Sequence, residues 1–99
     1  MSFFRVTFDK RLKRLVNSLP GKLRQEARHL IADLARDPRP PGAIELRGYP
    51  GIYRTWLQDA RYRLIWEVND EESRVEVYYV GPKPDYDQLL HEGEELTSE

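Results

Sequence analysis

Cysteine is absent from this chain of 99 residues. A disulfide framework, a thiolate metal site and a cysteine nucleophile are therefore excluded, and the absence agrees with a reducing cytoplasm. Histidine is also scarce, because the sequence contains only His29 and His91, which lie far apart. Two distant histidines without cysteine do not make a metal site, so we expect none in this protein.

Long apolar runs are missing too. No segment is long and hydrophobic enough to form a transmembrane helix, and the first residues lack the apolar core of a signal peptide. We therefore expect a cytoplasmic protein without membrane contact. The length fits one domain, and a hydrophobic fraction of 39% allows a modest core. We assign this domain to residues 1–91 and expect residues 92–99 to form an acidic, flexible tail.

The net charge of −1 conceals an uneven distribution along the chain. Residues 1–69 contain 14 Lys and Arg against 7 Asp and Glu, whereas residues 70–99 contain 2 against 10. Most cations of the first part are Arg, whose planar guanidinium suits phosphate, although many of them can simply solvate helix faces. The acidic end either keeps the chain soluble or folds back on the basic part and competes with nucleic acid.

The spacing of apolar residues predicts five strands and two main helices. A first strand covers residues 3–8, and Asp9 is placed to cap a helix that ends at Pro20-Gly21. A second amphipathic helix covers residues 22–36. Further strands are expected at residues 43–47, 53–57, 62–68 and 74–80, and a short helix at residues 85–91. This order predicts an α+β fold, in which a helical hairpin packs on one face of a mostly antiparallel sheet.

The hairpin over residues 53–68 carries the most informative pattern. Side chains alternate between the two faces of a strand, so Arg54, Trp56 and Arg63 gather on the face opposite the core. Arginine beside tryptophan suits a phosphate backbone and stacked bases. The alternative is that these arginines only solvate an exposed sheet face, which is common in antiparallel hairpins.

The same alternation assigns the other aromatic residues of these strands. Trp66 shares a face with Leu64 and Val68, so we expect it in the core. Tyr78 and Tyr79 are neighbours in the last strand, so we expect them on opposite faces, one in the core and the other exposed.

Five segments resemble one known family in their order and spacing. They are V-T-F-D-K-R-L-K-R-L, L-A-R-D-P-R-P-P-G, I-E-L-R-G-Y-P-G-I-Y-R, Y-R-L-I-W-E-V and V-E-V-Y-Y-V-G-P-K. Together they span about residues 3–90 and resemble the RelE/ParE superfamily of toxins from bacterial type II toxin–antitoxin pairs. The resemblance implies an N-terminal strand, an αα-hairpin and a mostly antiparallel sheet of about four strands packed on the helices.

The resemblance also implies a function. RelE-like members cut messenger RNA on the ribosome by attack of a ribose 2′-OH on the adjacent phosphate, with no metal and no cofactor. The alternatives are a ParE-like poison of DNA gyrase and a catalytically degenerate toxin homologue. In each case the expected partner is a cognate antitoxin, which should wrap the helical hairpin and the sheet with an amphipathic helix or an extended segment.

Site residues follow from the matching positions. The resemblance implies a catalytic set that consists of Arg63, Arg54, Lys83 and Tyr86. In this set, Arg63 would clamp the scissile phosphate. Residues expected to bind nucleic acid are Arg47, Arg54, Trp56, Arg61 and Arg63. Trp56 stands where nuclease members often carry a second basic residue. Leu89 stands roughly where they carry an aromatic acid or base, so Tyr86 or, as the alternative, His91 takes that role.

Overall fold

The computed structural model describes residues 3–90. In chain order its elements are β1 (Arg5–Thr7), α1 (Lys10–Asn17), α2 (Gly21–Asp33), β2 (Ile44–Glu45), β3 (Ile52–Trp56), β4 (Tyr62–Asn69) and β5 (Arg74–Pro82). A helical turn at residues 86–90 follows. His91 and the predicted acidic tail lie outside the described residues. Within the described range, no helix is long and apolar enough to cross a membrane.

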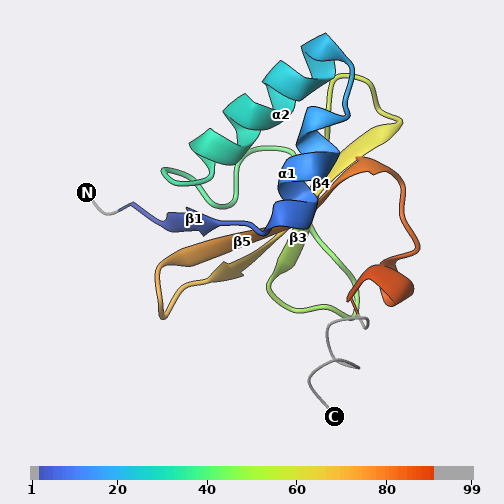
Figure 1. Cartoon of the computed structure of the whole chain (residues 1–99). Coiled ribbons are helices and arrows are strands. Elements are labelled where there is room, and N and C mark those ends of the chain that lie inside the picture. The colour runs from blue at the N-terminus through green and yellow to red at the C-terminus, as the bar shows by residue number, and fades with distance from the viewer. Residues whose placement is uncertain (1–2, 91–99) are drawn as a thin grey trace.

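The strands form one sheet in the order β1-β5-β4-β3-β2. β1 runs parallel to β5, and every other neighbouring pair is antiparallel. Figure 1 shows α1 and α2 on one side of this sheet, and the helical turn at residues 86–90 on the side away from α2. The predicted α+β fold is therefore confirmed, with the helical hairpin covering one face.

Several element boundaries differ from the prediction, and β1 is shorter than expected. β2 is shorter than expected, and α2 ends at Asp33, because the residues approaching Pro38 leave helical geometry and form turns. β5 extends to Pro82, because Gly81 and Pro82 pair with the first residues of β4. This extension carries the last strand alongside the candidate site.

The core lies between the helices and one face of the sheet. Asp9 caps α1 as predicted, since its carboxylate accepts a hydrogen bond from the backbone N–H of Leu12 at 2.9 Å. Trp66 is 0% exposed, which confirms its predicted burial, and its indole N–H donates to the carbonyl of Pro38 at 2.9 Å. The largest fully buried side chains are Trp66, Leu12, Leu34, Leu64, Ile65, Val75, Val77 and Val80.

The prediction that Tyr78 and Tyr79 lie on opposite faces is wrong. Ile65 pairs with Tyr79 and Trp66 pairs with Val77, so Tyr78 is an extra residue in β5. Such a β-bulge shifts the alternation by one residue. Both tyrosines therefore lie on the face away from the helices, where the Tyr78 hydroxyl donates a hydrogen bond to Glu67. Burial and this bond raise the pKa of Tyr78.

Candidate functional site

The open face of the sheet brings three of the predicted residues together. Trp56 in β3 pairs directly with Arg63 in β4. Arg54 pairs with Ile65, two residues further along the same two strands. Paired residues of antiparallel strands point to the same face. The predicted gathering of Arg54, Trp56 and Arg63 is therefore confirmed. Ile65 is 0% exposed although it lies on this face, so the face is partly covered there.

Trp56 lies within reach of both guanidinium groups. The central guanidinium carbons of Arg54 and Arg63 each lie 5.5 Å from the centre of its ring. A cation at this distance from an indole is attracted by about 0.5–1 kcal/mol at an exposed site. Trp56 is still 51% exposed, so a large part of the indole remains available for contact with a ligand.

The segment after β5 returns over this face and delivers Tyr86. Nη1 of Arg63 donates a hydrogen bond to the Tyr86 hydroxyl at 2.7 Å. The side chain of Asp85 accepts a hydrogen bond from the backbone N–H of Gln88 at 3.1 Å, which caps the helical turn at residues 86–90. The hydroxyl of Tyr49, in the turn between β2 and β3, donates to Asp87. Arg63 and Tyr86 thus form the centre of the site.

The Nε atom of Arg63 is buried and has no hydrogen-bond partner among the described residues. A guanidinium group has five N–H donors and binds oxyanions through two of them at once. The buried Nε–H is costly to leave unpaired. The site therefore contains one buried guanidinium donor without a partner, and the other N–H groups of Arg63 are the ones that can face a ligand.

Gly81 forms the side of the site opposite Trp56. It pairs with Arg63, and a Cβ atom at this position would lie 2.8 Å from the Tyr79 hydroxyl. The absence of a side chain leaves room for the tyrosine, whose hydroxyl donates to the carbonyl of Pro82 at 2.7 Å. Burial raises the pKa of Tyr79 above its ordinary value.

The other predicted residues do not join this centre. Arg61 is bound to Asp59 at the tip of the hairpin, with N–O distances of 2.8 and 3.0 Å. The hydrogen bonds from Arg61 lower the pKa of Asp59 to about 2. Arg47 and Lys83 are exposed, the first just after β2 and the second just after β5.

Sequence reasoning missed Tyr49, Asp87 and Tyr79. Tyr49 and Asp87 are 38 residues apart, and no periodic pattern connects a turn with a distant helical segment. Strict alternation leaves open which of Tyr78 and Tyr79 is exposed, and the bulge in β5 breaks that alternation. The one available signal was Asp85 three residues before Gln88, which is the spacing of a helix cap.

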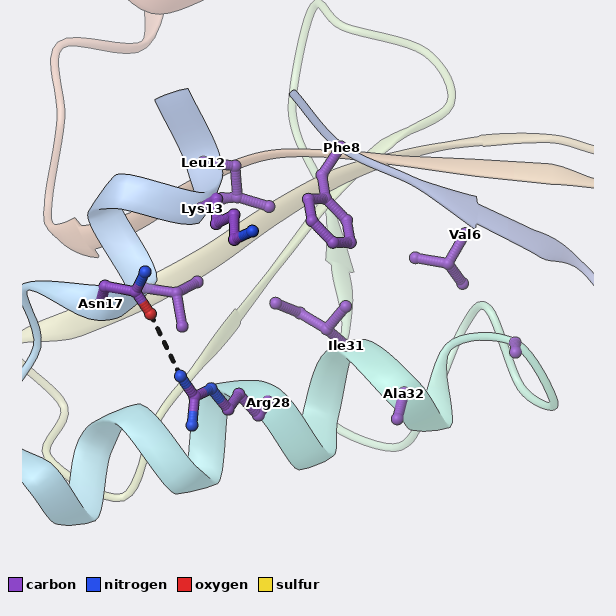
Figure 2. Close-up of a pocket in the computed structure, with 10 residues that line it drawn as sticks. Val6, Phe8, Leu12, Lys13, Asn17, Arg28, Ile31 and Ala32 are labelled. Carbon is purple, nitrogen blue, oxygen red and sulfur yellow. Dashed lines mark hydrogen bonds between the residues drawn. The ribbon is translucent and has the colours of Figure 1, made fainter. Parts of the chain in front are cut away.

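A second feature lies on the helical side of the molecule. A groove of about 450 Å³ opens between α1, α2 and β1, as Figure 2 shows. Phe8, at its edge, is 51% exposed. Arg28 donates a hydrogen bond to Asn17 at 3.1 Å across the groove. The lining is mostly apolar and consists of Val6, Phe8, Leu12, Lys13, Val16, Asn17, Arg28, Ile31, Ala32 and Ala35.

Known proteins similar to this chain were found by sequence. No family model matches it. The mRNA interferase toxin RelE of Escherichia coli K12 is 31% identical over 83 residues, which are 84% of this chain and 85% of the relative. The mRNA interferase RelE of Shigella flexneri matches with the same identity and the same coverage of both chains.

Solved structures give the same picture. A double arginine-to-alanine mutant of E. coli toxin RelE in the free state has a TM-score of 0.71 at 27% identity, covering 97% of this chain and 98% of its own. The toxin in the intact E. coli RelBE toxin–antitoxin complex has a TM-score of 0.69 at 28% identity, covering 82% of this chain and 98% of its own. These similarities favour the RelE branch over the ParE branch.

Proposed function

The chain belongs to the RelE family of type II toxin–antitoxin toxins, and we propose on this basis that it cleaves messenger RNA on the ribosome. The observation that carries the proposal is the contact of 2.7 Å between Arg63 and the Tyr86 hydroxyl, beside an exposed tryptophan. A phosphate-binding cation and a proton-carrying hydroxyl thus lie next to each other. Metal-independent cleavage of RNA needs such a cation and a proton donor, together with an acceptor for the proton of the 2′-OH.

In the proposed reaction, the ribose 2′-OH gives its proton to solvent water and its oxygen attacks the adjacent phosphorus. The bond to the 5′-oxygen breaks, which leaves a 2′,3′-cyclic phosphate. Arg63 binds the two non-bridging oxygens and stabilises the negative charge that develops on them. Arg63 is partly buried beside Trp56 and Tyr86, and electrostatic attraction is stronger in such surroundings than in bulk water. The contact of Arg63 with Tyr86 supports this role, because it holds the guanidinium at the open face of the sheet.

Tyr86 is the proposed proton donor for the leaving 5′-oxygen. Its hydroxyl oxygen accepts the hydrogen bond from Arg63, so its own proton is left to be donated. The adjacent guanidinium stabilises the phenolate that would form. Tyr86 thereby takes the role that Leu89 cannot fill at the position matching the family's aromatic residue.

The remaining predicted residues would hold the RNA strand. Arg54 would contact a neighbouring phosphate, and Trp56 would stack on a base, a contact worth about 1–3 kcal/mol. The outer residues Arg47, Arg61 and Lys83 would attract the RNA through long-range charge, an effect that weakens as salt is added. Their exposed positions fit this more distant role.

A cognate antitoxin is the proposed protein partner. RelE toxins similar to this chain have been solved with the antitoxin RelB. The groove between α1 and α2 supports such a partner, since its floor is apolar and Lys13 and Arg28 stand at its edge. An amphipathic helix with acidic flanks is complementary to this surface.

The decisive experiment is controlled expression without antitoxin of the wild type, Arg63→Ala and Arg36→Ala. Arg36 is the matched control, because its side chain is 70% exposed and, among residues 3–90, pairs with Asp33 at the end of α2. We expect growth arrest and new 5′ ends within translated messages for the wild type and the control, and neither for Arg63→Ala.

Other outcomes would contradict the proposal. Arrest with intact messages that persists in Arg63→Ala would point to gyrase or another protein target. Normal growth of the wild type would identify a degenerate toxin that has kept its fold and lost its reaction.

A further inference from the structure

Tyr86 is delivered by a segment that is too short to hold itself in place. The helical turn covers residues 86–90, and a helix of this length is not stable alone in water. Asp85 caps the turn through its side chain, and its carbonyl accepts a hydrogen bond from the N–H of Leu89 at 2.9 Å. These bonds are internal to the segment, so they shape the turn without attaching it to the sheet.

The attachment is made by Tyr49 and Asp87. The Tyr49 hydroxyl donates a hydrogen bond to the Asp87 carboxylate, and a bond to a charged group is among the stronger kinds. Asp87 follows Tyr86 directly, and successive residues of a helix point about 100° apart. The turn is therefore fixed in two directions, by Arg63 through Tyr86 and by Tyr49 through Asp87.

Tyr49 is a firm anchor because its own turn is well fixed. Its N–H donates to the carbonyl of Leu46 at 3.1 Å, and its carbonyl accepts from the N–H of Ile52 at 3.1 Å. The N–H of Gly51 donates to the side chain of Glu45 at 2.9 Å, which ties the turn back to β2. A side chain held by such a turn can restrain a mobile partner.

We infer that Tyr49 and Asp87 are positioning residues, which hold Tyr86 against Arg63 without touching the RNA. The inference rests on the proposed function for its effect on cleavage, but the geometry can be tested separately. When the pair is broken, the helical turn is held at one point and Tyr86 spends less time at the guanidinium. RNA should then still bind to Arg63, whereas proton donation should slow.

The test compares Tyr49→Phe with Tyr78→Phe. Each change removes one hydroxyl that donates to a carboxylate, and both tyrosines lie on the open side of the sheet, but Tyr78 contacts Glu67, away from Arg63. In Tyr49→Phe, amide hydrogen exchange at Gln88 and Leu89 should rise on the order of tenfold. The NMR signal of the Arg63 guanidinium should move as it does in Tyr86→Phe. Neither change is expected in Tyr78→Phe.

Cleavage gives the second readout. Single-turnover cleavage should fall on the order of tenfold in Tyr49→Phe and Asp87→Ala, with RNA affinity changed less than about twofold. Asp87→Asn should recover part of the rate, because its amide oxygen still accepts a hydrogen bond.

The two readouts separate the two ideas. Unchanged exchange and an unchanged Arg63 signal in Tyr49→Phe would overturn the positioning role, whatever the enzyme does. A moved signal with an unchanged cleavage rate would also overturn it. If the wild type cleaves nothing, the proposed function fails, while the NMR comparison still decides whether this pair positions Tyr86.

Discussion

At the scale of single residues, the positions of the Arg54 and Arg63 guanidinium groups explain why an aromatic side chain suits position 56. Both guanidinium groups lie 5.5 Å from the ring centre. A third cation in this place would repel both of them. The indole instead attracts each guanidinium and keeps a face exposed. The site therefore combines two charges with a stacking surface.

This arrangement predicts a graded effect of substitutions at Trp56. Trp56→Leu should weaken binding of single-stranded RNA on the order of tenfold, because base stacking and both cation–π contacts are lost. Trp56→Phe should weaken it less, since an aromatic ring remains. Fluorescence anisotropy with a labelled RNA at fixed salt measures both. Equal affinity for the wild type and Trp56→Leu would exclude a stacking role.

Gly81 makes a second prediction at this scale. Gly81→Ala should lower the free energy of unfolding by about 1–3 kcal/mol, because its φ of +155° is unfavourable for alanine and the new methyl group meets the Tyr79 hydroxyl. Urea unfolding checks the value. In a Tyr79→Phe background the cost should be smaller, since the clashing atom is gone. The same cost in both backgrounds would show that only the backbone conformation matters.

At the scale of elements, the connector between α2 and β2 is held on the sheet by Arg39. Its guanidinium donates to both carboxylate oxygens of Asp70, at 3.1 and 2.7 Å, and to the Tyr53 hydroxyl at 2.8 Å. The Trp66 bond to Pro38 fixes the start of the same connector. A proline-rich segment that joins the helical layer to β2 is thus fastened to β3 and to the end of β4.

The pH dependence of stability tests this fastening. The bond to Arg39 lowers the pKa of Asp70 below its ordinary value of 3.8. The contribution of this bond to the stability of the fold is therefore complete above the ordinary pKa of Asp70. It is lost as the pH falls through the lower pKa that Asp70 has in the folded state. Asp70→Asn should lower the Tm at pH 7, and the difference from the wild type should shrink below about pH 4.

Thermal unfolding by circular dichroism from pH 2 to pH 7 measures this difference. Asp33→Asn is the control, because its partner Arg36 lies three residues away in the same segment and the pair joins no separate elements. A difference between wild type and Asp70→Asn that is constant across this range would contradict the assignment.

At the scale of the whole molecule, the sheet separates two surfaces of different chemistry. The helical side carries the apolar groove beside α1 and α2, and the other side carries Arg63 with its aromatic neighbours. Under the proposed function, a protein partner and an RNA strand would therefore bind at separate places on one small domain. A helix in the groove would leave the site open unless the same partner also reached around the sheet.

How much the sequence could predict also depends on scale. Strand alternation was sufficient to place Arg54, Trp56 and Arg63 on one face, because their strands are regular there. It was insufficient for Tyr79, because a bulge leaves no periodic signal. The Tyr49 contact depends on how a distant segment folds back, which only tertiary packing decides. The residues that share one face of regular strands could thus be predicted from the sequence. The contacts made by the segment that folds back over the sheet could not.

The parallel pairing of β1 with β5 determines when the sheet can be completed during synthesis of the chain. Arg5 lies beside Arg74, so the first strand finds its place only after the last strand has been made. Chains fold as they emerge during synthesis, and distant strands pair late. The residues from Arg74 onward complete the sheet and supply Tyr86. A chain translated only as far as β4 has therefore not yet assembled the group of residues around Arg63.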